Sequence, residues 1–511
     1  MRSSATSEPY AASVAVVEPH GLEQIDERER HGKPRDLFAL WFAANAETAT
    51  FAVGILTIAL YGTSFRGACV GLIIGNVLGY AVVAALSQLG PRFGRPQMVV
   101  SRRAFGRIGN ELPAVLAFLS GVGWFAINSV FGAAALGALF HLSYVPSLAI
   151  VLAAQIAIAI YGHNMIHAFE KIAAVALTIG FVVIAVETLR RTNGAAGFDV
   201  HAPVAAGGEI AGVIFSAALA FSYAIGWAPC AADYSRYLPA ASSARAVRSW
   251  AFFGGWLPST ALEILGAAAV TALPNAHLAD ATPSQVIADL FGGPLAVLGL
   301  VTVTLGTLSA NCLNLYSGAM SALVAWDTRR RASLAIAVAV LFGALTALVL
   351  ALARAGDPAA ASLNTTTIVF AAAAVAALCG LVVRYTLARW QAALAVGIVG
   401  GALALVGAHP ERTAHLYSNF LLLLSTWAAP WAGALLATRS DGTARPVAHG
   451  FAGWLAGIAA SLPFWQQAWF TGPIAAANPR LGDVSYFVGF AVAFGVTRTL
   501  SHMRRAREAA A

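Results

Sequence analysis

Residues 215–239, FSAALAFSYAIGWAPCAADYSRYLP, join an apolar helical run to a segment that cannot continue as a regular helix. Residues 215–225 are almost wholly apolar, and the four residues Gly-Trp-Ala-Pro at 226–229 follow where the middle of a membrane-spanning helix is expected. Pro229 lacks the N–H that would bond the carbonyl of Ile225, and the residue before a proline disfavours helical backbone. We therefore predict that the helix breaks at 226–229.

An interrupted helix has a functional meaning inside a membrane. An unpaired carbonyl in hydrocarbon costs several kcal/mol, so a broken helix persists only where protein or a wet cavity surrounds it. Breaks of this kind are typical of the binding sites of secondary transporters. The stretch therefore predicts a solute-binding site at mid-membrane depth.

The whole chain has the composition of a helical membrane protein. It has 511 residues, of which 59% are hydrophobic and only 11% charged, and its mean hydropathy is +0.73. Apolar runs of about 20 residues, each long enough to cross a bilayer, recur along the sequence, whereas the short alternating segments of a membrane barrel are absent. We predict an all-α polytopic protein with about fourteen transmembrane helices.

The positive charge is explained by membrane topology. The net charge is +8 with 31 Lys and Arg residues, and most of these fall in loops that are cytoplasmic when the N-terminus is inside. An even number of spans returns the C-terminus to the same side. We therefore expect a multi-pass protein of the cytoplasmic (inner) membrane, with the lipid bilayer as its partner, both termini cytoplasmic, and no nucleic-acid ligand.

Polar residues mark the middle of the first span, 37–62, which contains Asn45 and Glu47. A buried acid is unfavourable in hydrocarbon and should face the interior of the bundle. These residues lie at a depth similar to that of 226–229, on a helix of opposite direction. Two disturbed helices at matching places predict an inverted repeat of five plus five helices.

Two connecting segments are predicted to lie outside the membrane. Residues 1–36 form a polar tail that we expect to be disordered and to orient the first helix. Residues 91–111, with five arginines and several turn formers, are predicted to be a cytoplasmic loop.

Other polar positions carry weaker signals. His163 and His167 have the spacing of a metal pair and Glu170 follows, but no metal-binding pattern surrounds them, so we expect a loop or helix-end role. Glu263 is a second buried acid, either a structural partner or part of a proton route. Dinucleotide and Walker motifs are absent from the sequence, which argues against dinucleotide binding and ATP driving. The sequence also lacks a convincing catalytic constellation, so we expect that the protein is not an enzyme and has no metal site and no cofactor.

Four motifs in order resemble the purine–cytosine permease group of the nucleobase:cation symporter family. They are GVGWFAIN (121–128), IGWAPCAADYSRYLP (225–239), TLSANCLNLYSGAMSAL (307–323) and the loop GRPQMVVSRRAFG (94–106). The similarity covers about 30–325 and resumes near 418–439. This resemblance implies the leucine-transporter fold, a twelve-helix core with two inverted five-helix repeats. It also implies the family's activity, in which uptake of a flat heterocycle is coupled to sodium or protons.

The chain departs from that pattern by two additional apolar runs, 332–353 and 365–384. We interpret them as an inserted hairpin on the twelve-helix core; the alternative makes them core helices nine and ten. The predicted division is therefore as follows: tail 1–36, first repeat 37–190, first three helices of the second repeat 208–325, inserted hairpin 326–388, last two helices of that repeat 389–439, and two peripheral helices with a tail at 440–511.

The resemblance implies a substrate site on helices three, six and eight. Trp124 and Trp227 match the family's paired aromatic residues, and a base stacked on an aromatic ring gains roughly 1–3 kcal/mol. Amides can both donate to and accept from a base edge, and the broken backbone can also do so. The predicted substrate-binding residues are Trp124, Asn128, Gly226, Trp227, Ala228, Asn311 and Asn314.

A cation site is implied between helices one and eight. In sodium-coupled relatives, carbonyls of helix one and hydroxyls of helix eight supply oxygen ligands, but Ala310 stands here where a second hydroxyl is common. A proton on Glu47 is the alternative. The predicted coupling residues are Asn45, Glu47, Ala49, Gly306 and Ser309.

Two functions fit these features. The first is a secondary-active importer of a nucleobase or related planar heterocycle of the cytosine, purine, allantoin or hydantoin type, driven by proton or sodium symport. The second is a substrate-sensing membrane receptor that retains the transporter fold, which would bind the solute without accumulating it. The sequence leaves open which heterocycle is bound and the oligomeric state.

Overall fold

The computed structural model describes residues 10, 13–191, 207–271, 286–287, 290–327, 387–406, 410–438, 449–467 and 470–510. Long helices dominate the described parts of the chain, which also include one short hairpin of β1 (Gln466–Gln467) and β2 (Phe470–Thr471). Seven of the described helices are long and apolar enough to cross a membrane, or eight when one bent pair counts as a single span. The predicted hairpin at 326–388 lies almost wholly outside the described residues, and the predicted total of fourteen spans stays a prediction.

The first half of the chain follows the predicted order of spans. Its helices are α1 (Asp36–Asn45), α2 (Thr48–Ala59), α3 (Phe65–Ser87), α4 (Leu89–Phe93), α5 (Gln97–Gly109), α6 (Glu111–Phe140), α7 (Tyr144–Tyr161) and α8 (His163–Arg191). The predicted loop at 91–111 was wrong in part, because most of it forms α5. Its apolar residues Met98, Val99 and Val100 are buried, so this segment packs as a helix despite its arginines.

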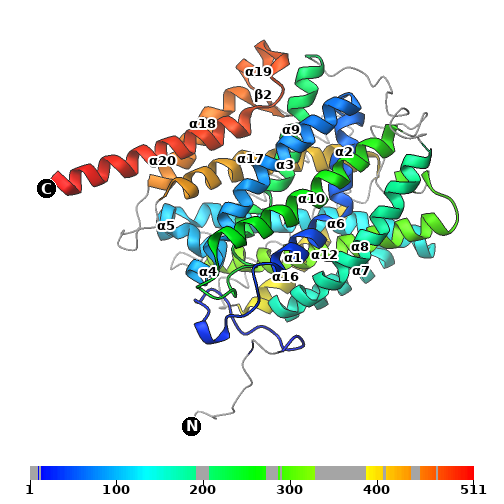
Figure 1. The fold of residues 1–511 in the computed structure, drawn as a ribbon, viewed down its shortest axis with the longest axis horizontal. Helices are drawn as coiled ribbons and strands as arrows, with labels where there is room; N and C mark the ends of the chain where they lie inside the picture. The colour runs from blue at the N-terminus through cyan, green and yellow to red at the C-terminus, as the bar shows by residue number, and fades with distance from the viewer. Residues whose placement is uncertain are drawn as a thin grey trace, which may run out of the picture.

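The second half contains α9 (Glu209–Ile225), the 3₁₀ turn η4 (Ala228–Cys230), α10 (Ala244–Thr271), α12 (Pro294–Trp326), α16 (Arg389–Val406) and α17 (Pro410–Ala437). Beyond these come α18 (His449–Ser461), η6 (Leu462–Phe464), α19 (Pro473–Ala477), η7 (Pro479–Leu481) and α20 (Ser485–Ala510). The first of the two peripheral helices predicted within 440–511 is short, because Pro463 follows the end of α18 and the chain then turns into the β-hairpin. In Figure 1, α18 and α20 run side by side at the edge of the bundle.

Helix packing divides the interior into two groups. One group contains α2, α3, α9 and α10, in which α3 packs along α9 and α10 packs against both α2 and α3. The other contains α6, α7, α8, α12 and α16, in which α6 packs along α12. The bent pair α1–α2 contacts both groups, so residues at its bend lie between them.

Close helix contact in the first group depends on Gly54 of α2. A Cβ atom at this position would lie 1.7 Å from the backbone oxygen of Glu263 on α10. Gly54→Ala should therefore force α2 and α10 apart, and overpacking of this kind destabilises by about 1–3 kcal/mol or more. Thermal unfolding in detergent checks this, with Gly495→Ala on α20 as control because nothing lies within 4 Å of a Cβ there. Equal melting temperatures for the two variants would contradict the prediction.

The N-terminal tail differs from the prediction. Residues 13–35, which we call the strap, are not a disordered tail but lie against one end of the bundle, where Figure 1 shows them in dark blue. Glu18 and Ile25 are buried in the strap, and backbone N–H groups of Glu18 and His31 donate to carbonyls of Tyr161 and Tyr237. The strap is held against the bundle by hydrogen bonds between its polar groups and groups of the helices and turns that it covers.

Candidate functional site

The predicted break after Ile225 is confirmed. The α-helix α9 ends at this residue, and the N–H groups of Gly226 and Trp227 donate to carbonyls three residues back rather than four. The same tighter pattern continues through η4 and the turns that follow it. Ala228 is fully buried and Trp227 is 6% exposed. The unwound backbone is therefore enclosed by protein, as an interrupted helix in hydrocarbon requires.

A second break separates α1 from α2, whose axes differ by 53°. Glu47 lies at this break with extended backbone, and its Oε1 accepts a hydrogen bond of 3.1 Å from the hydroxyl of Tyr223 near the end of α9. Thr50 Oγ1 lies 2.6 Å from both the Asn45 carbonyl and the Tyr223 hydroxyl. The two broken helices thus meet through side chains at their breaks.

Asn45 connects the same two helices. Its Oδ1 accepts from Trp227 Nε1 at 2.9 Å and from the Tyr80 hydroxyl at 2.6 Å, while its Nδ2 donates to the Trp41 carbonyl at 2.7 Å. These bonds occupy both acceptor positions of Oδ1 and one N–H of the amide, and they set the orientation of the Trp227 indole. The predicted coupling role of Asn45 stays a prediction, and the structure places its side chain against Trp227, a predicted substrate residue.

Trp124 reaches the α9 break from α6. A Cβ on Gly226 would lie 3.2 Å from Trp124 Nε1, so the indole sits against the unwound backbone next to Trp227. Each ring contact that the structure gives for Trp124 is edge-on, with centroid distances of 5.5 Å to Tyr223 and 5.2 Å to Phe420. The two predicted tryptophans therefore lie at the same break.

The three predicted asparagines divide into two kinds. Asn311 Nδ2 donates to the Phe125 carbonyl at 2.9 Å and to Ser129 Oγ at 3.1 Å, and its Oδ1 accepts from Asn314 Nδ2 at 3.1 Å. Asn311 therefore joins α12 to α6, and Asn314 supports it from the same helix. Asn128, one turn from Trp124, is fully buried, yet neither its Nδ2 nor its Oδ1 has a partner among the described residues.

A carboxylate from another helix contacts the predicted cation segment. Ser309 Oγ donates to Oε2 of Glu170 on α8 at 2.5 Å, and Glu170 is fully buried. The expected loop or helix-end role was wrong for Glu170, because α7 ends at Tyr161, Gly162 (φ 88°) separates the two helices, and α8 already begins at His163. An acid seven residues into an apolar helix was the signal that could have identified it.

The turn of α12 from Gly306 to Ser309 lies between two acids. A Cβ on Gly306 would lie 2.9 Å from the Ala46 carbonyl and 3.0 Å from Glu47 Cα, so this face of α12 touches the α1–α2 break. Ser309, one turn later, contacts Glu170. The carbonyl of Ala49, a predicted cation ligand, accepts instead from the Tyr417 hydroxyl at 3.0 Å.

Comparison with known proteins identifies the family of the chain. A family profile described as permease for cytosine/purines, uracil, thiamine, allantoin matches residues 24–354. The chain belongs to this permease family. YxlA of Bacillus subtilis, which bears a purine-cytosine permease name, is 31% identical over 311 residues, covering 60% of this chain and 65% of YxlA. The purine-cytosine permease fcyB of Emericella nidulans is 30% identical over 322 residues, covering 60% of this chain and 62% of fcyB.

The matched stretches span less than two thirds of these permeases. A solved structure covers more: Mhp1, a nucleobase-cation-symport-1 family transporter in a closed conformation with bromovinylhydantoin bound, has a TM-score of 0.63 and 17% identity over 96% of both chains. The chain therefore has the leucine-transporter-type helical fold that the motifs implied.

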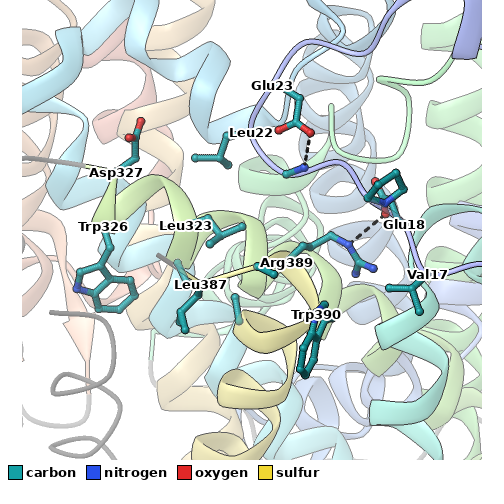
Figure 2. Close-up of a pocket in the computed structure, with 15 residues that line it drawn as sticks. Val17, Glu18, Leu22, Glu23, Leu323, Trp326, Asp327, Leu387, Arg389 and Trp390 are labelled. Carbon is teal, nitrogen blue, oxygen red and sulfur yellow. Dashed lines mark hydrogen bonds and ion pairs between the residues drawn. The ribbon is translucent and has the colours of Figure 1, made fainter. Parts of the chain in front are cut away.

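The strap closes one end of the permease through Glu18, which is buried (Figure 2). Its Oε1 accepts from Arg236, Tyr237 and Tyr316, and its Oε2 lies 3.4 Å from Arg389. Residues that follow η4 (Arg236 and Tyr237) thus meet residues of α12 and α16 on one carboxylate.

A cavity of about 490 Å³ adjoins this cluster, with Glu18, Leu22, Trp326 and Arg389 in its lining. It lies away from Trp124 and Asn128, and the chain between its lining residues Asp327 and Leu387 falls outside the described residues. We therefore place the candidate substrate site at the two helix breaks.

Proposed function

We propose that this permease is a secondary-active importer of a nucleobase or a related planar heterocycle across the cytoplasmic membrane, with both termini in the cytoplasm. The observation that carries the proposal is Asn128, a buried amide one turn from Trp124 at the α9 break, whose donor and acceptor atoms have no partner in the part of the chain that the structure describes. A buried amide without partners is unfavourable unless a ligand supplies them.

A planar heterocycle supplies what this site lacks. Its edge carries donors and acceptors that pair with an amide, and its flat faces stack on indoles. The described ring contacts of Trp124 and Trp227 are edge-on. The purine-cytosine permease names of the relatives support the same class of substrate.

Uptake by purified protein in sealed vesicles tests this function. Labelled cytosine, adenine, hypoxanthine, uracil, allantoin and a hydantoin would be offered with an inward proton gradient, an inward sodium gradient, or neither. We expect accumulation above equilibrium of at least one compound under one gradient. Saturable binding without accumulation would favour the receptor hypothesis, and neither binding nor uptake of any compound would contradict the proposal.

Glu170 is our proposed coupling residue, with a proton as the coupled ion. A buried carboxyl can take up and release a proton. Ser309, the predicted hydroxyl ligand of a cation, donates to this carboxyl, and Cys312 Sγ lies 3.3 Å from its other oxygen. Glu47, whose Oε2 has no partner among the described residues, lies against Gly306, one turn before Ser309 on α12.

Glu170→Gln should therefore uncouple uptake from the proton gradient. The amide cannot take up and release the proton, so we expect accumulation driven by a pH gradient to be lost while exchange of labelled for unlabelled substrate persists. Paired measurements of gradient-driven uptake and exchange check this. Glu187→Gln is the matched control on α8, because Glu187 pairs only with Arg191 at the helix end. Undiminished gradient-driven uptake in Glu170→Gln, or coupling to sodium in the wild type, would contradict the assignment.

A further inference from the structure

A second buried carboxyl lies outside the candidate site, between α3 and α10. Glu263 of α10 is fully buried, as is Asn76 of α3, and Asn76 Nδ2 donates to Glu263 Oε2 at 2.5 Å. One helical turn away, Tyr80 of α3 and Ser259 of α10 also hydrogen-bond, at 2.6 Å. The two contacts form one polar seam joining the helices.

Two oxygens of this pair are left without hydrogen bonds. Glu263 Oε1 and Asn76 Oδ1 are both buried, and neither has a partner among the described residues. A carbonyl-type oxygen can only accept, so these two acceptors cannot satisfy each other. An ionised Glu263 would thus place a charge with one free oxygen in the membrane interior, which is strongly unfavourable.

Among the described residues, no positively charged side chain pairs with Glu263. Glu263 forms no ion pair within the described parts of the chain. Helix α2, which packs on α10, has no ionisable side chain. From α3, only the Tyr80 hydroxyl lies near, because Arg66 sits ten residues from Asn76 in the first turn. Lys171 of α8 does not compensate Glu263, because it pairs with Asp36 of α1.

We propose that Glu263 and Asn76 form a proton-binding site in which Glu263 is a neutral carboxylic acid. Its O–H donates to Asn76 Oδ1 while Asn76 Nδ2 donates to the other carboxyl oxygen, which closes a cyclic acid–amide pair. One proton satisfies both orphaned oxygens and removes the charge. The site binds this proton permanently and is distinct from the coupling acids.

Its position explains why the proton is resident. Both residues belong to helices of one packed group, with α2 pressed against the Glu263 backbone at Gly54. A transported proton must reach both sides of the membrane in turn. A proton enclosed within one packed group of helices would not be exposed when that group moves against the other group. The proton instead makes a charge-free link between α3 and α10.

Isosteric exchange tests the ring directly. In Glu263→Gln, the new amide N–H₂ takes the place of the O–H, so both hydrogen bonds persist without a proton; gradient-driven uptake and the melting temperature should stay close to wild type. Asn76→Asp places two carboxyls together, so it should melt at a lower temperature that falls further as pH rises. The double variant Asn76→Asp/Glu263→Gln restores one acid and one amide of the original lengths and should recover the wild-type melting temperature.

Infrared difference spectroscopy gives a readout that does not depend on transport. The spectrum of wild type minus Glu263→Gln at neutral pH should contain the carbonyl band of a protonated carboxylic acid, and that band should be absent from the variant. A carboxylate band instead would overturn the proposal, as would loss of proton-driven uptake in folded Glu263→Gln, or sodium-dependent stabilisation of the wild type that this variant lacks. Failure of the importer hypothesis would leave the infrared and melting results unaffected.

Discussion

Asn128→Ala is expected to bind its substrate about tenfold to hundredfold more weakly than the wild type, and yet to melt at a higher temperature without substrate. The amide has no partner in the described chain, so alanine removes a buried polar group that the empty protein leaves unsatisfied. Loss of its bonds to a ligand amounts to roughly 1–3 kcal/mol, which corresponds to the stated range of affinity. Binding titrations and thermal unfolding with and without substrate measure both effects.

Asn311→Ala is the matched control on the facing helix. Because Asn311 bonds Phe125, Ser129 and Asn314, its loss should lower the melting temperature of the empty protein, the opposite sign from Asn128→Ala. If Asn128→Ala instead destabilised the empty protein and left affinity unchanged, Asn128 would be a packing residue and the substrate site would lie elsewhere.

Glu18→Ala should have the largest effect on stability. The substitution leaves Arg236 and Arg389, both buried, without their carboxylate, and breaking a buried ion pair by removing one partner costs about 3–5 kcal/mol. Chemical or thermal unfolding of the purified protein measures the loss. Glu23→Ala is the control on the same strap, because Glu23 is 54% exposed and its carboxylate, within the described chain, pairs with His20 and accepts from the Gly21 backbone N–H. Such surface pairs contribute about 0–1 kcal/mol. Similar losses in both variants would show that the strap is not held by Glu18.

The same cluster makes stability depend on pH. Burial by itself raises the pKa of Glu18, but Arg236 and Arg389 outweigh burial and hold the pKa of this carboxyl below its ordinary value. A carboxyl whose pKa is lower in the folded than in the unfolded state stabilises the folded protein at pH values above the unfolded-state pKa. This stabilisation is lost as the pH falls through the folded-state pKa. The wild type should therefore lose more stability in acid than Glu18→Gln, which has no carboxyl at this position.

The sequence alone determined the features that depend on local chemistry. Pro229 removes a backbone donor wherever it stands in a helix, so the end of α9 could be predicted without its neighbours. Apolar runs of membrane length likewise indicated the spans, and the motifs around Trp124 and Trp227 indicated the family. These properties belong to single segments and do not depend on how the helices pack.

Only the tertiary structure decided which polar groups are paired. Asn128, Asn311 and Asn314 are equivalent as residue types, but the rotation of α6 against α12 leaves Asn128 free and uses the other two. The same dependence hid the contacts of Ser309 with Glu170, of Glu263 with Asn76, and of Glu18 with two arginines, which are 139, 187 and more than 200 residues apart in sequence. A hydrogen bond requires two atoms within about 3 Å, and for residues so far apart that distance is fixed by helix packing and not by sequence spacing.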